Sequence, residues 1–178
     1  MQKRKDRIEM RITKADIITV IIAVAIVASS LCIIKPTIVS GESMEPTLQD
    51  NNYLILNRLA YRNDTPERGD IIVFPGDDGD RLFIKRVIAV GGDTLQIDGD
   101  DVVLNGDILD EPYINISEDM YDENGEWVVP EGCVFAMGDN RGNSHDSRDD
   151  SLGFVPVSDI MGKVMIRLFP PSELGRIE

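Results

Sequence analysis

The longest apolar run in the body of the chain reads LFIKRVIAV, from Leu82 to Val90, and it ends at a Gly-Gly pair. Successive side chains of a β-strand point to opposite faces. In this run each face is apolar apart from one cation, which is Lys85 on one face and Arg86 on the other. The pattern predicts a strand buried on both sides. A lysine among such neighbours loses its water shell, which lowers the pKa of its ammonium group.

Shorter apolar runs flank this strand in the sequence and alternate with turn signals. Beyond residue 36 no long stretch has helical periodicity. The runs have the length of strands, and two of them flank an Asp-Gly-Asp-Asp turn at 98–101 that is typical of a hairpin. We therefore predict an all-β domain, barrel-like or sandwich-like. We interpret the acid-rich segment 107–131 as a surface loop. The shorter runs lie at 53–56, 71–74, 94–97, 102–104, 134–137 and 164–169.

The N-terminal region carries an uncharged apolar run, residues 17–34, behind a basic segment. As a helix, its eighteen residues rise about 27 Å, close to the roughly 30 Å of a hydrocarbon core. A cleaved signal peptide has a shorter apolar region and an Ala-x-Ala exit, and a buried core helix would not explain the basic cluster. We expect a single-pass cell-membrane protein with a cytoplasmic N-terminus over 1–14, a transmembrane anchor over 15–34 and an extracytoplasmic β-rich domain over 35–178.

Charge and cysteine content argue against several classes of function. The formal net charge is −14, and the first 14 residues hold six basic side chains against two acidic ones, so the rest is still more acidic. Such a body repels phosphates, and we expect no nucleic-acid partner. Cys32 and Cys133 offer no disulfide framework and no zinc spacing. Without metal-ligand spacing or a phosphate loop, we expect neither a metal nor a cofactor.

A second segment, residues 40–47, contains a candidate nucleophile. It reads SGESMEPT and presents Ser43. Gly41 permits unusual backbone angles and Pro46 fixes one, so the segment is a shaped turn. Ser43 follows Ile34 by nine residues, which span at most about 30 Å, so the serine stays close to the outer membrane surface. A neutral Lys85 can take the hydroxyl proton of Ser43 and so activate it as a nucleophile.

A third segment, residues 137–148, reads MGDNRGNSHDSR and lies between two apolar runs. Its polar residues are those of a hydrogen-bonded turn. The same density of Ser, Asp and Arg also suits a set of side chains that orient a catalytic lysine.

Together the three segments resemble the bacterial type I signal peptidase family. Residues 43–47 look like its nucleophile box, residues 85–93 like its lysine box, and residues 138–148 like its C-terminal box. Asn105-Gly106 and the Glu-Pro-Tyr at 111–113 also match family positions. The resemblance runs in order from the anchor to about residue 156. The single anchor and compact body are similar to the short forms typical of Gram-positive bacteria.

The resemblance implies a membrane-bound serine endopeptidase with a Ser/Lys dyad. Its substrates would be exported preproteins, cleaved after small residues in Ala-x-Ala sites, and we expect it to act as a monomer. Ser43 would be the nucleophile and Lys85 the general base, with Ser144 hydrogen-bonding to the lysine. The supporting polar cluster would be Asp139, Asp146 and Arg148, and the residues lining the substrate pockets would be Met44, Leu48, Phe83 and Ile84. Some relatives have a serine where this chain has Gly41, so the second oxyanion donor is not assigned.

Three other interpretations stay open on the sequence alone. One is a Ser-His-Asp triad that uses His145 with Asp139 or Asp146. Another is a self-cleaving repressor-type protease, although this chain has an apolar anchor in place of a DNA-binding domain. The third is a membrane-tethered, non-enzymatic β-domain that binds envelope proteins.

Overall fold

The computed structural model describes residues 13–76, 79, 81–99, 101–114 and 125–177, and within its helix the side chains of residues 24–32 are also left undescribed. The chain divides into two compact units, Met1–Ile33 and Ile34–Glu178. The first unit contains α1 (Lys14–Ile33). Thr13 and Asp16 cap this helix, because the Thr13 Oγ1 accepts the Asp16 N–H at 3.2 Å and the Thr13 N–H reaches the Asp16 carboxylate at 2.8 Å.

The predicted transmembrane anchor falls on α1, which begins and ends one residue before the predicted limits. Among the described residues, no helix is both long enough and apolar enough to cross a membrane. The anchor therefore stays a prediction.

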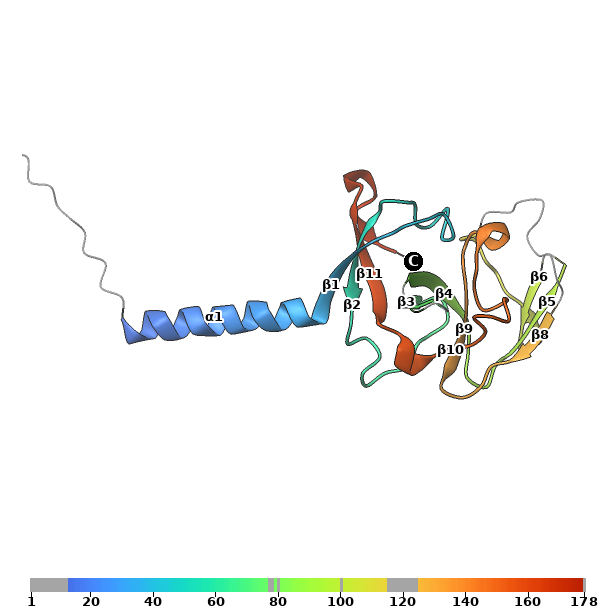
Figure 1. The fold of residues 1–178 in the computed structure, drawn as a ribbon, viewed down its shortest axis with the longest axis horizontal. Helices are drawn as coiled ribbons and strands as arrows, with labels where there is room; N and C mark the ends of the chain where they lie inside the picture. The colour runs from blue at the N-terminus through green and yellow to red at the C-terminus, as the bar shows by residue number, and fades with distance from the viewer. Residues whose placement is uncertain (1–12, 77–78, 80, 100, 115–124, 178) are drawn as a thin grey trace, which may run out of the picture. The chain divides into compact units, whose positions relative to one another are not determined.

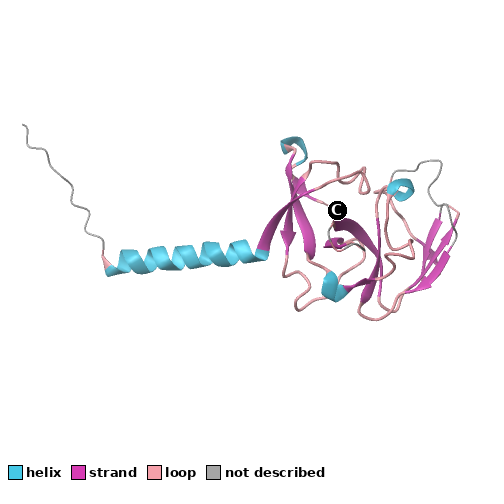
Figure 2. Cartoon of the chain, viewed as in Figure 1, coloured by secondary structure: helices cyan, strands magenta, loops and turns pink. Residues whose placement is uncertain are grey.

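The second unit consists of two antiparallel sheets with short 3-10 helices between strands, as Figure 2 shows by colour. The larger sheet has the order β1 (Ile34–Ile38), β2 (Tyr53–Asn57), β11 (Gly162–Phe169), β3 (Ile71–Pro75), β4 (Leu82–Val90), β9 (Cys133–Met137) and β10 (Val155–Pro156), with β12 (Gly175–Arg176) beside β11 (Figure 1). The smaller sheet has the order β7 (Asp107–Ile108), β6 (Asp101–Leu104), β5 (Thr94–Asp98) and β8 (Gly125–Val128). The 3-10 helices are η1 (Arg141–Asn143), η2 (Val157–Asp159) and η3 (Pro171–Glu173). The predicted all-β class is confirmed for this unit.

Strand β4 occupies the run that predicted it, Leu82 to Val90, and lies between β3 and β9. Its residues 84–89 are all buried, as expected for a strand covered on both faces. On one face Val87 packs in a cluster with side chains from β3, β9 and β10. On the other, Ile88 joins the cluster beneath the smaller sheet, and Ala89 joins it as well because the pairing of β4 with β9 shifts register between Val87 and Ala89. A third cluster, around Leu48 and Ile84, supports the turn that follows β1.

The hairpin predicted around residues 98–101 is confirmed, since β5 pairs with β6 from Leu95 to Asp98. The interpretation of 107–131 as a surface loop is wrong for its two ends. Residues 107–108 form β7, and β8 pairs with β5 along residues 125–128. The Trp127 ring lies 5.0 Å from the Phe135 ring and packs against the core. Residues 115–124 of that segment lie outside the described residues.

Candidate active site

Ser43 lies in a turn between β1 and β2 that is closed by backbone hydrogen bonds. The Val39 N–H donates to the Asn52 carbonyl at 2.9 Å, and the Asn51 N–H returns to the Val39 carbonyl at 3.0 Å. Gly41 has φ +98°, a conformation that L side chains rarely adopt. Its N–H donates to the Asp50 carboxylate at 2.9 Å. The turn is therefore fixed on both sides of the serine.

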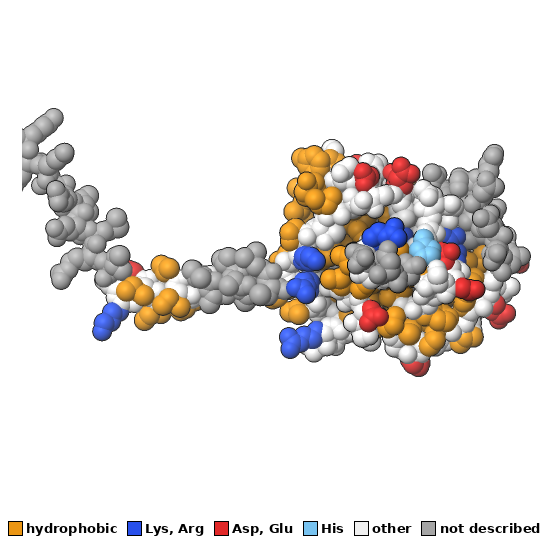
Figure 3. Space-filling view, in the orientation of Figure 1, with side chains coloured by type: hydrophobic (Ala, Val, Ile, Leu, Met, Phe, Trp, Pro, Cys, Tyr) orange, Lys and Arg blue, Asp and Glu red, His pale blue; other side chains and the backbone are white. Residues whose placement is uncertain are grey.

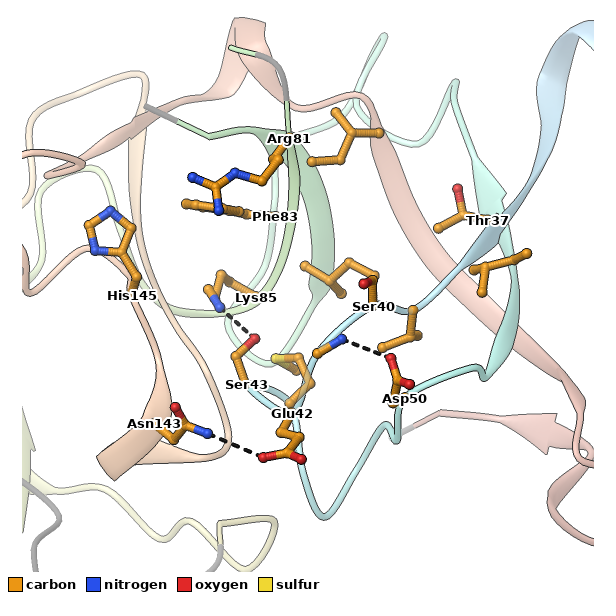
Figure 4. A pocket seen from close by; sticks show the side chains of 16 residues that line it. Thr37, Ser40, Glu42, Ser43, Asp50, Arg81, Phe83, Lys85, Asn143 and His145 are labelled. Carbon is orange, nitrogen blue, oxygen red and sulfur yellow. Dashed lines mark hydrogen bonds between the residues drawn. The ribbon is translucent and has the colours of Figure 1, made fainter. Parts of the chain in front are cut away.

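Lys85 reaches the serine from β4. Its Nζ lies 2.7 Å from Ser43 Oγ, and the two side chains point toward each other in Figure 4. Strand pairing with β3 sets Lys85 opposite Ile72, and the side chain of Phe83 lies beside the amine, with its ring centroid 5.5 Å from Nζ. Lys85 as a whole is only 3% exposed.

Burial is the largest influence on the charge state of Lys85. Loss of water lowers the pKa of the amine from 10.5 to about 8, although the nearby Asp146 carboxylate opposes this shift. About a tenth of the lysine is thus neutral at pH 7, several hundred times more than for a lysine with the ordinary pKa of 10.5. A neutral amine at hydrogen-bonding distance from a serine hydroxyl has the position and the basicity of a general base.

Two ion pairs flank this dyad, one fully buried and one with a partly exposed arginine. Arg86, the residue after the lysine, donates to Asp139 through two nitrogens at 2.9 and 2.8 Å. Arg148 donates to Asp146 at 2.8 and 2.9 Å, and the Gly138 N–H donates to the same carboxylate at 2.9 Å. Burial alone would raise the pKa of Asp146, but Arg148 and these hydrogen bonds outweigh it and hold that pKa below its usual value.

Ser144 is the one member of the predicted cluster whose role the geometry does not display. Its Oγ is buried and makes no hydrogen bond of regular geometry among the described residues, but it lies near the Asp146 carboxylate and helps to lower the pKa of that group. The predicted hydrogen bond from Ser144 to Lys85 is therefore not formed in this structure. The other three, Asp139, Asp146 and Arg148, are brought together beside the dyad.

A cleft of about 890 Å³ opens over Ser43 and Lys85. Of the predicted pocket residues, Met44, Phe83 and Ile84 line it. Leu48 does not line it: the side chain is 0% exposed and packs in the core beneath the turn beside Met44, so its place in a substrate pocket stays a prediction. The full lining is made of residues 37–44, Asp50, residues 81–85, Asn143 and His145.

The chain is similar in sequence to a known family of proteins. The sequence profile of the family described as signal peptidase, peptidase S26, matches residues 11–169. The chain belongs to this family. It is therefore a serine peptidase, and membership of a hydrolase family decides against the non-enzymatic binding domain.

Individual relatives of this S26 peptidase cover most of its length. Signal peptidase I of Bacillus caldolyticus is 38% identical over 84% of this chain and 87% of the relative. Signal peptidase I of Bacillus licheniformis is 34% identical over 93% of this chain and 91% of the relative. The crystal structure of a signal peptidase I from Enterococcus faecalis matches with TM-score 0.50 and 33% identity, covering 56% of this chain and 97% of that one.

His145 lies at the edge of the cleft of this peptidase, but not in a serine triad. Its Nδ1 lies 2.9 Å from the Asp149 carboxylate, and its ring packs edge-on against Phe83. The two aspartates considered as triad partners are bound instead to Arg86 and Arg148. In Figure 4 the imidazole sits beyond Lys85 as seen from Ser43.

Several polar residues of the cleft were not among the predicted site residues, and two of them make hydrogen bonds that shape the serine turn or its edge. Asp50 accepts the Gly41 N–H, so this N–H is already used and does not point to a developing oxyanion. Asn143 donates to the Glu42 carboxylate at 3.4 Å. Asn143 lies within the segment 137–148 that the sequence singled out, but no pattern there marks it individually, and none marks Asp50. Among the described residues, no group of three or more His, Cys, Asp and Glu side chains is placed to hold a metal ion.

Proposed function

We propose that the chain is a signal peptidase I: a membrane-anchored serine endopeptidase that removes N-terminal signal peptides from exported preproteins by cleavage after small residues. The observation that carries this proposal is the 2.7 Å approach of Lys85 Nζ to Ser43 Oγ inside an open cleft. The family's relatives, named signal peptidase I, support the choice of substrate.

In the acylation step, Lys85 accepts the hydroxyl proton of Ser43 while Oγ attacks the carbonyl carbon of the scissile bond. The tetrahedral intermediate collapses, the carbon–nitrogen bond breaks, and the Lys85 ammonium gives its proton to the leaving nitrogen. This leaves the signal peptide as an ester on Ser43. A water molecule then attacks the ester, Lys85 takes the water's proton, and the proton returns to Oγ as the acid product leaves.

The oxyanion of each tetrahedral intermediate needs hydrogen-bond donors. The Ser43 N–H is our first candidate, because the backbone amide of a nucleophile lies next to the carbonyl it attacks. Loss of one such donor costs about 2.7–4 kcal/mol of transition-state stabilisation in a well-studied serine protease. We therefore expect a second donor. Gly41 is not our candidate, because its N–H already donates to Asp50.

The apolar part of the cleft supports a preference for small substrate side chains. Met44 is buried in the core below the serine, and Phe83 and Ile84 come from the strand that carries the lysine. Large side chains at these three positions reduce the space beside the dyad. We propose that they line the pockets for the small residues of an Ala-x-Ala site.

The membrane part of the proposal rests on the sequence and on one surface of the second unit. Residues 17–34 are uncharged and apolar, with basic residues before them, which favours a cytoplasmic N-terminus. Ile38, Tyr53 and Phe169 face each other in register across β1, β2 and β11, and all three are about half exposed. Exposed apolar patches also appear on the face drawn in Figure 3. We propose that the chain is a single-pass membrane protein whose second unit acts outside the cytoplasm.

The test is cleavage of a purified preprotein with an Ala-x-Ala site by the full chain in detergent or lipid, with the products identified by mass spectrometry. We expect one cut, directly after the second alanine. A preprotein with leucine in place of that alanine is the matched control and should stay intact. If neither preprotein is cut while a general peptidase substrate is, the activity is that of a serine peptidase with other substrates.

A further inference from the structure

Residues 111–113, here called the EPY segment, follow β7 and contact two arginines of the polar network. Glu111 accepts two hydrogen bonds from Arg141, at 2.6 and 2.5 Å. The Arg141 side chain is 0% exposed and the Glu111 side chain is 6% exposed. The Tyr113 hydroxyl donates to the same glutamate at 2.7 Å.

The second arginine contact is made by the ring of Tyr113. The guanidinium carbon of Arg86 lies 4.0 Å from the ring centroid, within the range of a cation–π interaction. The same guanidinium also binds the Asp139 carboxylate, the Gly69 carbonyl at 3.1 Å and the Thr47 hydroxyl at 3.5 Å. The EPY segment thus covers the guanidinium that fixes Asp139.

Both arginines bind the stretch 138–140. Arg141 Nε donates to the Gly138 carbonyl at 3.1 Å, while Arg86 binds the side chain of Asp139. The same stretch also contacts the nucleophile turn. The Asn140 N–H donates to the Ser43 carbonyl at 3.1 Å, and its side-chain amide donates to the Glu42 carbonyl at 3.1 Å.

Buried ion pairs of this kind are a poor source of stability, because desolvation of both ions offsets their attraction. Their bidentate geometry instead fixes the orientation of the groups that they join. Here the ion pairs fix residues 138–140, and these residues hydrogen-bond directly to the turn that carries Ser43 Oγ. Displacement of a catalytic group by about 1 Å can lower a rate by about 100-fold.

We propose that Glu111 and Tyr113 are positioning residues for catalysis: through Arg141 and Arg86 they press residues 138–140 against the Ser43 turn and keep Ser43 Oγ within reach of Lys85. The inference rests on the proposed function, since it assumes that Ser43 and Lys85 carry out the cleavage. Neither residue touches the reacting atoms, so each acts through an arginine. The contribution of the EPY segment is to the rate of the chemical step.

The test compares Glu111→Gln, Tyr113→Leu and Tyr113→Phe with Asp110→Asn, in the full chain and with the preprotein substrate. Asp110 is the matched control, because it is an exposed acid beside Glu111. We expect kcat to fall by about 10- to 100-fold in Glu111→Gln and Tyr113→Leu with KM changed by less than about twofold, the size of effect that misplacement produces. Tyr113→Phe keeps the ring over Arg86 and should lose less. Asp110→Asn should match wild type.

A second measurement separates positioning from folding. Rates are expressed per active serine, titrated with a covalent serine-directed inhibitor, and the pH dependence of kcat/KM is recorded for each variant. If residues 138–140 loosen, water reaches Lys85 and the pH midpoint moves upward. A purely structural role lowers the number of active serines and leaves both kcat per serine and the midpoint unchanged, which would overturn the inference. Failure of wild type to cleave, or cleavage by Ser43→Ala, would overturn the proposed function instead.

Discussion

Gly138 lies so close to the carbonyl oxygen of Ser43 that no side chain fits between them. A Cβ built on Gly138 would collide with this oxygen and also with Ser144 Oγ. The backbone after β9 therefore approaches the nucleophile turn directly. This approach allows the Asn140 N–H to bind the Ser43 carbonyl.

We predict that Gly138→Ala lowers kcat/KM by about 100-fold or more, since the added methyl group must push the serine turn away from Lys85. The measurement is the rate of preprotein cleavage per active serine. Gly175→Ala is the control, because a Cβ there meets no atom within 4 Å. Equal rates for the two alanine variants would mean that the close approach is not needed.

The pH dependence of activity follows from the charge state of Lys85. Burial lowers its pKa to about 8, and only the neutral amine can accept the serine proton. We predict that kcat/KM rises about tenfold per pH unit below pH 8 and levels off above it, because kcat/KM reports the ionisation of the free enzyme. A profile that is flat between about pH 6 and 9 would contradict a titrating lysine base.

Asp50 offers a prediction that the sequence alone would not have raised. Asp50→Ala removes the acceptor of the Gly41 N–H, and a hydrogen bond to a charged group contributes about 1.5–3 kcal/mol. We predict a loss of about tenfold or more in kcat/KM. Asp50→Asn keeps an acceptor oxygen and should retain most of the activity. If both variants lose activity equally, the charge of Asp50 and not the Gly41 contact is what matters.

His145 provides the opposite prediction. It contacts Asp149 and Phe83 at the cleft edge and takes no part in the Ser43–Lys85 pair. We predict that His145→Ala keeps kcat within about threefold of wild type, as expected for a group outside the proton transfer. A pH-independent loss of 1000-fold or more in that variant would revive the histidine triad.

A continuous apolar run was enough to predict β4, because a strand covered on both faces has apolar residues at nearly every position. An Asp-Gly turn between two short apolar runs predicted the hairpin of β5 and β6. Neither signal marked β8, whose Trp127 is held by the Phe135 ring from a distant strand, a contact that local sequence does not encode. The class of the fold was therefore predictable, while one edge of the smaller sheet was not.

The candidate site likewise contains some residues that the sequence predicted and others that it did not. Lys85 could be found from its apolar neighbours and Ser43 from its turn and the family resemblance. Leu48 was predicted to line a pocket because it matches a family position, and this stays a prediction: the side chain packs in the core, and its N–H donates to the Met44 carbonyl. Asp50 reaches the cleft through the closure of the loop between β1 and β2, which no spacing rule anticipates.

The most direct test of the dyad is cleavage of an Ala-x-Ala preprotein by the wild-type chain, Ser43→Ala and Lys85→Ala under one set of conditions in detergent or lipid. We predict that wild type cleaves and that each substitution alone abolishes cleavage, because the nucleophile and its base act as one unit. Far-ultraviolet circular dichroism of all three chains confirms that they are folded. Normal cleavage by a folded Lys85→Ala chain would contradict the assignment of Lys85 as the general base.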